Sequence, residues 1–237
     1  MGRKPNAKSA REPADVRVHL ALHRAIINHS IPPGTPLLED SLASAFKVSR
    51  TVVRKSLQRL AHERLVDIVP NKGASVAKPS ADEARQIFEA RRELEQSLVK
   101  RAIQHASDTD LKNLLKLAKT EQQAHAHGQK SQRLRLSGDF HRQLATLSGN
   151  GVLEAFLAEL VSRSSLIIAL YESPGAIPCS HTEHLEIANA ILARDSAKAV
   201  RYMENHLRHI EAQIDLTQGD QVPDFDRLFS QARKSQK

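Results

Sequence analysis

The first third of the chain shows an order of segments that few folds can satisfy, with three helix-length segments followed by two short β-type runs. Apolar residues recur at helical spacing in the three segments, and Pro32-Pro33-Gly34 separates the first from the second. Ser49 can cap the third helix, and Pro70-Asn71-Lys72-Gly73 supplies a turn between the β-type runs. Three helices closed by a small hairpin predict a winged helix-turn-helix. We expect its helices at 15–29, 38–46 and 50–64, and its strands at 65–69 and 74–77.

After this hairpin only helical patterns remain. Pro79 interrupts the pattern and Ser80 can cap the next helix, so Lys78-Pro79-Ser80 is the expected linker. We expect the later helices at 81–105, 108–127, 132–147, 150–171, 177–193 and 195–215. The predicted fold class is therefore mainly α, with an N-terminal winged helix-turn-helix and a C-terminal all-helical domain. The expected division is a disordered basic arm at 1–14, the winged helix at 15–78, the helical domain at 79–216 and a polar tail at 217–237.

The composition agrees with helix packing and excludes several classes of protein. The chain has no Trp and only 3% aromatic residues, which suits helix packing better than a sandwich or barrel. No apolar run approaches the ~18 residues that a membrane span needs, and the basic segment Met1–Arg11 lacks the apolar stretch of a secretory signal. A single cysteine, Cys179, excludes an internal disulfide and is expected to be inert. These features predict a cytoplasmic protein that does not contact a membrane.

The net charge of +8 is concentrated in the first third of the chain, which comprises the basic arm and the predicted winged helix. Up to Ser80 the chain has 14 Lys and Arg against 6 Asp and Glu, whereas the remainder has 21 of each. A basic module joined to a neutral one is typical of a protein that binds nucleic acid. A basic face kept only for solubility is the alternative, and it would be favoured if no motif accompanied the charge.

The third helix carries such a motif. A recognition helix places its N-terminal residues at base edges in the major groove, and an arginine there can bind guanine through two hydrogen bonds. Hydroxyls and free N–H groups at the helix start suit phosphate oxygens, and a lysine beside a wing glycine can reach a phosphate or the minor groove. For any one of these side chains taken alone, an ordinary solvated surface residue is a simpler interpretation than a DNA contact. The predicted DNA contacts are Ser49, Arg50, Thr51, Arg54, Lys72 and Gly73.

Residues 15–77 resemble the DNA-binding domain of the GntR superfamily of transcriptional regulators. The matching segments are Ile31-Pro-Pro-Gly34, Leu42-Ala43, Val48-Ser-Arg-Thr-Val-Val-Arg54, Leu57-Gln-Arg-Leu60 and Pro70-Asn-Lys-Gly73. The resemblance implies base or phosphate contacts by Ser49, Arg50, Thr51 and Arg54, with Gly73 at the tip of the wing. This sequence departs from the family at Arg64, where glycine is usual after the recognition helix, so we expect a change in the turn into the wing.

The helical remainder is similar to the FCD-type domain of the FadR branch. The similarity rests on Arg91-Arg-Glu-Leu-Glu95, Phe140-His-Arg-Gln-Leu144, Ser148-Gly-Asn150, Glu183-His184 and His206-Leu207. It implies an antiparallel helical bundle around a polar pocket, where one Asp and three His hold a metal, often zinc or nickel, against which many members bind an organic acid. Ser137 stands where the family has its Asp, and Asp139, two residues before His141, is expected to point elsewhere.

Three histidines are candidate metal ligands on independent grounds. His141, His184 and His206 each share a helix face with apolar residues, so each is expected to point inward. Three converging imidazoles suit a divalent first-row metal such as zinc or nickel. A structural histidine in the core is the alternative for each one, and a domain that has lost its metal is the alternative for the set. His181 and His209, one turn from His184 and His206, are expected at the surface rather than behind the ligands.

Three further residues are candidates for binding a carboxylate effector. Arg91 and Arg163 could each face the pocket, where the guanidinium fork matches a carboxylate. A salt bridge to a neighbouring glutamate is the alternative for each of them. Ser137 completes the set of predicted effector contacts, because it takes the place of the usual metal ligand.

The leading functional hypothesis is a homodimeric DNA-binding regulator, most simply a repressor. Two copies would place their recognition helices on adjacent major-groove faces of a pseudopalindromic double-stranded DNA operator. A metalloenzyme with His141, His184 and His206 around a catalytic zinc is the second hypothesis. Against it, the apolar faces offer no general base, and the histidines lack HExxH-type spacing. A metal-free architectural protein is a third, and it would bind DNA without sequence preference.

Overall fold

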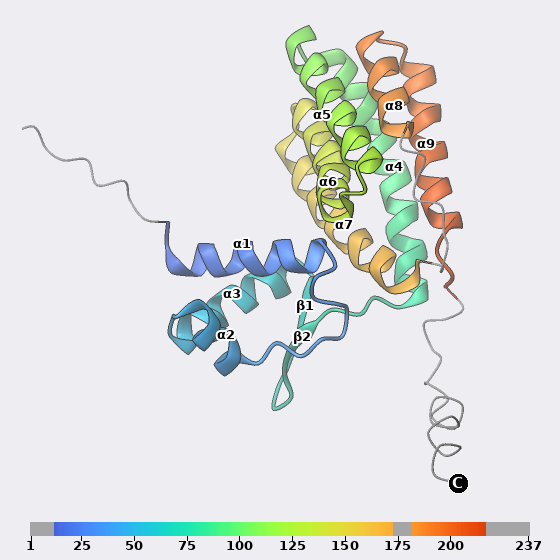
Figure 1. Ribbon diagram of the computed structural model, residues 1–237. Coiled ribbons are helices and arrows are strands. Elements are labelled where there is room, and N and C mark those ends of the chain that lie inside the picture. The colour runs from blue at the N-terminus through green and yellow to red at the C-terminus, as the bar shows by residue number, and fades with distance from the viewer. Residues whose placement is uncertain (1–11, 173–181, 217–237) are drawn as a thin grey trace, which may run out of the picture.

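The computed structural model describes residues 12–172 and 182–216. Figure 1 shows two parts: an N-terminal unit with a small two-stranded sheet, and a bundle whose helices lie side by side above it. The bundle alone carries six of the helices found in these residues. The mainly α fold class is thereby confirmed. None of the helices in the described segments is long and apolar enough to cross a membrane.

The N-terminal unit is a winged helix-turn-helix. Its elements are α1 (Ala14–Ile27), α2 (Glu39–Phe46), α3 (Arg50–His62), β1 (Val66–Val69) and β2 (Gly73–Val76). The strands are antiparallel, with Val66 opposite Val76 and Val69 opposite Gly73. Ser49 caps α3 as expected, because its Oγ accepts a hydrogen bond from the Val52 amide at 3.4 Å. Apolar residues from all three helices and both strands close one core, including Val18, Ile26, Val53, Leu57, Leu60, Val66 and Val76.

The turn into the wing shows why Arg64 is an unusual residue at its position. Arg64 has a φ of +59°, in the left-handed region where glycine has no steric cost. For a residue with a Cβ this conformation costs roughly 1–2 kcal/mol. The chain therefore makes this turn with a strained arginine, and the hairpin still forms.

The bundle consists of six helices, four of which begin at a residue whose side chain caps the helix. The six helices are α4 (Ala81–His105), α5 (Asp108–Ala126), α6 (Lys130–Leu147), α7 (Gly151–Tyr171), α8 (Glu183–Leu192) and α9 (Ser196–Ala212). The side chains of Ser80, Ser107, Asn150 and Asp195 each accept hydrogen bonds from the first backbone amides of the next helix. The expected helix at 177–193 is described only from residue 182, and Cys179 lies outside the described residues. So do the arm up to residue 11 and the tail after 216.

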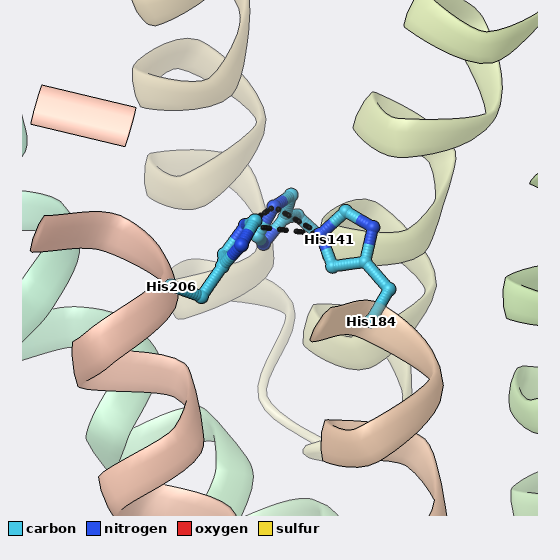
Figure 2. A group of neighbouring side chains, drawn as sticks. All are labelled: His141, His184 and His206. Atoms are coloured by element: carbon cyan, nitrogen blue, oxygen red, sulfur yellow. Dashed lines mark hydrogen bonds between the residues drawn. The ribbon is translucent and has the colours of Figure 1, made fainter. Parts of the chain in front are cut away.

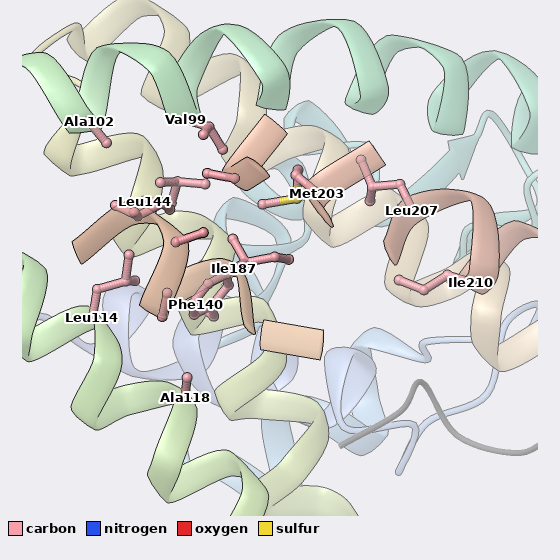
Figure 3. Packing of buried hydrophobic residues seen from close by; sticks show 14 of the residues in the cluster. Val99, Ala102, Leu114, Ala118, Phe140, Leu144, Ile187, Met203, Leu207 and Ile210 are labelled. Carbon is pink, nitrogen blue, oxygen red and sulfur yellow. The ribbon is translucent and has the colours of Figure 1, made fainter. Parts of the chain in front are cut away.

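Apolar side chains from the bundle helices pack into one large core and a smaller separate cluster of Leu98, Ala145, Leu157 and Val161. Phe88, Phe140, Leu114 and Leu144 are fully buried in the large core. Figure 3 shows Phe140 and Ile187 beside Met203 and Leu207, so that α6, α8 and α9 meet in this core. The buried His184 side chain lies at the edge of this core. Its ring stacks on the Phe140 ring, with the two ring centroids 4.3 Å apart.

The two parts of the molecule meet along α7. Leu166 of α7 is buried in the core of the winged helix rather than in that of the bundle. The Tyr171 hydroxyl donates a hydrogen bond to the Pro79 carbonyl in the linker at 2.9 Å. One helix of the bundle is therefore packed directly into the winged helix.

Candidate functional site

Three histidines from three different helices converge at one point in the bundle. His141 comes from α6, His184 from α8 and His206 from α9, and all three side chains are buried (Figure 2). Their Nε2 atoms lie 3.2 Å apart for His141 and His184, 3.0 Å for His184 and His206, and 3.4 Å for His141 and His206. The structure therefore brings the three predicted ligand residues together, and each of them presents its Nε2 atom to the same point.

A glutamate holds the opposite nitrogen of each ring. The three Nδ1–carboxylate contacts are His141 to Glu95 at 2.5 Å, His184 to Glu121 at 2.6 Å and His206 to Glu183 at 2.7 Å. Because a carboxylate only accepts, each Nδ1 carries the hydrogen and each Nε2 turns a lone pair toward the centre. Carboxylate partners of this kind orient metal-binding histidines.

Sequence reasoning assigned no role to these three glutamates, although Glu95 and Glu183 lie in segments that carry the resemblance to the FCD domain. Glu95 and Glu121 each lie among buried apolar positions of their helix, and Glu183 is adjacent to His184 in sequence. A charged residue on an apolar face is a signal that could have identified the first two. Which histidine each glutamate contacts depends on packing between helices, and a single helix pattern does not contain it.

The electrostatics of the cluster keep the imidazoles of His141 and His206 neutral. Burial, with a smaller contribution from the neighbouring His184, lowers the pKa of His141 to about 4 and that of His206 to about 3, although the glutamate beside each ring acts in the opposite direction. Burial works against charge on Glu95 as well, but the Arg91 guanidinium and His141 outweigh it and hold the pKa of Glu95 at about 2. Neutral imidazoles beside ionised carboxylates are the protonation states that a metal site requires.

The geometry of the cluster fits a tetrahedral divalent metal. Three nitrogens held about 2.0–2.1 Å from one zinc at tetrahedral angles stand roughly 3.3–3.4 Å apart, close to the observed 3.0–3.4 Å. Ser137 lies one helical turn before His141 and lines a cavity beside it, together with Arg91. Asp139 forms ion pairs with Arg135 and Arg142 instead, as expected for its position on the helix.

The structure separates the two arginines proposed as effector contacts. Arg91 is 3% exposed and lines the cavity with His141, while its Nε donates to Glu95 at 2.8 Å and its Nη1 to Ser164 at 2.9 Å. Arg163 does not line this cavity. It lines another one beside the linker, where it forms ion pairs with Glu83 and Glu159.

His209 is half-exposed, yet it belongs to the polar surroundings of the cluster. Its Nδ1 bonds the Oε1 atom of Glu183 at 2.6 Å, and the other oxygen of that carboxylate bonds His206. The expectation of a plain surface histidine therefore describes only part of its environment. His181 lies outside the described residues.

The predicted DNA contacts lie together on an exposed surface of the winged helix. Ser49, Arg50, Thr51 and Arg54 are exposed at the start of α3, and Lys72 and Gly73 are exposed at the turn of the wing. Arg50 pairs with Asp40, and Arg54 makes two hydrogen bonds to Glu39, at 3.0 and 2.8 Å. The sequence did not predict these partners. Exposed pairs of this kind are worth only about 0–1 kcal/mol, so DNA can replace them at little cost.

Comparison with known proteins identifies both parts of the chain. Residues 15–76 match the family model of bacterial regulatory proteins of the gntR family, and residues 86–209 match the FCD domain. The chain is 30% identical to the HTH-type transcriptional repressor NanR of Cronobacter sakazakii, covering 90% of this chain and 88% of that protein. It is 28% identical to the Nta operon transcriptional regulator of Aminobacter aminovorans, covering 88% and 99%. Its identity to the repressor RspR of Escherichia coli is 26%, covering 86% and 90%.

Solved structures show the same fold. E. coli McbR/YncC superposes with a TM-score of 0.77 at 22% identity, covering 87% of this chain and 98% of that one. A putative transcriptional regulator GntR from Rhodococcus sp. RHA1 gives a TM-score of 0.73 at 25% identity, covering 88% and 99%. The chain has the domain pair of DNA-binding regulators with an effector domain, and its relatives are regulators rather than enzymes. It therefore belongs to the GntR family of bacterial transcriptional regulators, in the FadR-type branch that carries an FCD domain.

Proposed function

We propose that this protein is a repressor that binds a pseudopalindromic operator as a homodimer and senses a small carboxylate through a divalent metal, zinc or nickel. The observation that carries the sensing part is the convergence of three Nε2 atoms, each of them 3.0–3.4 Å from the other two. Without a cation, three buried lone pairs would repel one another, because each Nδ1 already donates to a carboxylate. A metal relieves this repulsion. The cytoplasm, where bacterial DNA lies, is the compartment that such a function requires.

The chain's own residues hold the metal and leave room for a ligand. His141, His184 and His206 supply three nitrogens, and Glu95 with the two other glutamates keeps their rings oriented. The metal, when bound, supplies Lewis-acid positions that a carboxylate can occupy. Ser137 in place of the usual Asp removes one protein ligand, so more of those positions are left for the effector or for water.

The exposed face of α3 and the wing supports DNA recognition. A single winged helix buries only a small interface with DNA. A dimer doubles this interface and places two recognition helices on one side of the duplex. NanR of Cronobacter sakazakii and RspR of Escherichia coli both carry the name transcriptional repressor. Repression by occupying the operator follows from this arrangement without any further partner.

The test measures operator binding as a function of metal and ligand. The operator is first selected from random duplexes with the full-length chain. DNA affinity is then measured for metal-free protein, for zinc-loaded protein, and for zinc-loaded protein with succinate. A change of about 5–150-fold between these states corresponds to the usual range of allosteric coupling. Equal affinity in all three states would contradict the sensing function, while sequence-selective binding would still support the regulator.

Arg50→Ala is expected to weaken specific DNA binding by about 1–3 kcal/mol and to flatten discrimination at one base pair. The reason is that Arg50 lies exposed in the first turn of α3, from which a side chain can reach a base edge. Arg59→Ala, at an exposed position near the other end of the same helix, is the control. Affinities for single-base operator variants measure the effect, and unchanged discrimination would remove Arg50 from the base-reading residues.

Lys72→Ala is expected to weaken binding to all duplexes about equally and to lower the slope of log affinity against log salt by roughly one. Lys72 lies at the exposed wing turn, where its ammonium can contact a phosphate. Lys100→Ala removes the same charge from an exposed position of α4 in the bundle and should leave the slope unchanged. A loss that depends on the DNA sequence would argue against a phosphate contact.

A further inference from the structure

The Glu183 carboxylate joins a buried histidine of the cluster to a half-exposed histidine outside it. Its Oε2 atom accepts a hydrogen bond from His206 Nδ1 at 2.7 Å, and its Oε1 atom accepts one from His209 Nδ1 at 2.6 Å. The His206 side chain is buried, whereas the His209 side chain is 41% exposed. Because both oxygens are engaged, the carboxylate cannot rotate without losing one of these bonds. The orientation of the His206 ring therefore depends on His209 as well as on Glu183.

The amide of Gln213 contacts the other nitrogen of the His209 ring. Its Nε2 atom lies 2.7 Å from His209 Nε2, one helical turn further along the chain, at the residue that caps the C-terminal end of α9. Since Nδ1 of His209 carries the hydrogen that Glu183 accepts, its Nε2 accepts a hydrogen from the amide. Four side chains thus form one chain of hydrogen bonds from the histidine cluster to the end of α9, in the order His206, Glu183, His209 and Gln213.

The segment that follows α9 is attached to the linker between the two domains through Tyr171. Two residues after Gln213, the Asp215 amide donates a hydrogen bond to the Tyr171 carbonyl at 2.8 Å. The Tyr171 side chain is buried, and its hydroxyl donates to the Pro79 carbonyl at 2.9 Å. One residue of α7 therefore contacts both the segment after α9 and the linker.

An ordinary polar pair on the same turn of α9 shows how His209 differs. Arg208 donates two hydrogen bonds to Glu204, at 3.1 and 2.8 Å, on the exposed face of the helix. Such a pair, four residues apart, contributes only to the helix itself. The partner of His209 is instead the carboxylate that also holds the buried His206 ring. A change at His209 is therefore passed on through Glu183 to a member of the histidine cluster.

We propose that His209 is a positioning residue of the metal site, and that the C-terminal turn of α9 transmits metal binding to the linker. In the metal-bound protein the His206 ring is fixed in place, and it fixes Glu183 and His209 in turn. The end of α9 then becomes more ordered, together with its contact to Tyr171 beside the linker. Because coupling between two sites is reciprocal, a change in the linker on DNA binding also changes metal affinity. The inference rests on the proposed function for the presence of the metal.

The first measurement is zinc affinity, by competition with a chromophoric chelator on the full-length chain. His209→Ala removes the hydrogen bond to Glu183, so we expect about 3–10-fold weaker binding, less than the roughly 10–100-fold loss for a direct partner of a ligand. His209→Asn puts an amide nitrogen where Nδ1 stood and is expected to stay within about twofold of wild type. Arg208→Ala removes the exposed pair with Glu204 from the same turn and is expected to leave zinc affinity unchanged.

The second measurement is hydrogen exchange of the backbone amides, without zinc and at saturating zinc. In wild type and Arg208→Ala, we expect zinc to slow exchange at residues 213–216 and at the linker with the first turn of α4. In His209→Ala, this slowing is expected to be lost at both places. Tyr171→Phe removes only the hydroxyl that bonds Pro79. Zinc should therefore bind to it as to wild type and slow exchange after α9, but not at the linker.

Several results would contradict these roles. Equal zinc affinity in wild type and His209→Ala, or equal losses in His209→Ala and Arg208→Ala, would overturn the positioning role. A linker that exchanges at the same rate with and without zinc, or that still responds in Tyr171→Phe, would overturn the transmission to the linker. If wild type bound no zinc, the metal part of the proposed function would be contradicted, and the inference with it. That result is distinct from the others, in all of which wild type binds zinc.

Discussion

Replacing His141, His184 and His206 together by alanine is expected to abolish metal binding, from about one zinc or nickel ion per chain to none. The three Nε2 atoms are the only converging group of potential ligand atoms found among the described residues. Removing them takes away the whole binding free energy, which reaches about 10–16 kcal/mol in structural zinc sites. Mass spectrometry of protein purified without a metal-affinity tag measures the metal content directly.

The matched control for this variant removes three exposed histidines instead. His62, His105 and His127 are exposed, and none of them belongs to the cluster. Replacing them by alanine should leave the metal content unchanged. If both triple variants retained the same metal, the ion would be bound elsewhere. If wild type contained none, Ser137 in place of the family Asp would mark a metal site that this protein has lost.

Glu95→Gln is expected to destabilise the protein by about 3–5 kcal/mol, because it removes one partner of a buried ion pair. Glu95 is fully buried, and its carboxylate bonds both Arg91 Nε and His141 Nδ1. With a neutral amide there, the buried Arg91 charge is no longer compensated. For a chain of this length the loss corresponds to a fall in Tm of roughly 6–20 °C. Thermal or urea unfolding of the metal-free protein measures it.

The same substitution at Glu93 separates this effect from a general loss of charge. Glu93 lies two residues before Glu95 on α4, and its side chain is exposed. Glu93→Gln should change the stability by less than about 0.5 kcal/mol. Glu95→Gln should also weaken metal binding by about 10–100-fold, since it releases the His141 ring. Similar stabilities for the two variants would show that the Arg91–Glu95–His141 contacts contribute little.

Much of the winged helix was predictable because its signals are local. The cap at Ser49, the spacing of Val53, Leu57 and Leu60, and the turn at Pro70–Gly73 each act within a few residues. Arg64 shows the limit even here. The departure from glycine was visible, but the positive φ that makes it costly appears only in the folded turn.

In the bundle, periodicity predicted which face of each helix is buried but not which helices meet. The inward positions of His141, His184 and His206 followed from the apolar residues around each of them. The prediction for Arg91 and Arg163 was less complete. Both are held by glutamates, but only Arg91 lies beside the histidines.

The sequence by itself therefore determined the order of the two domains and the caps and buried faces of their helices, and it predicted which exposed residues contact DNA. Tertiary structure alone decided that three imidazoles present the same nitrogen to one point, that Glu95 orients one of them, and that His29 reaches Ser165 across the domain boundary. The physical reason is the distance along the sequence over which each kind of interaction acts. Helix periodicity and capping act over a few residues, whereas these contacts join residues 22 to 136 positions apart, whose meeting depends on how whole helices pack.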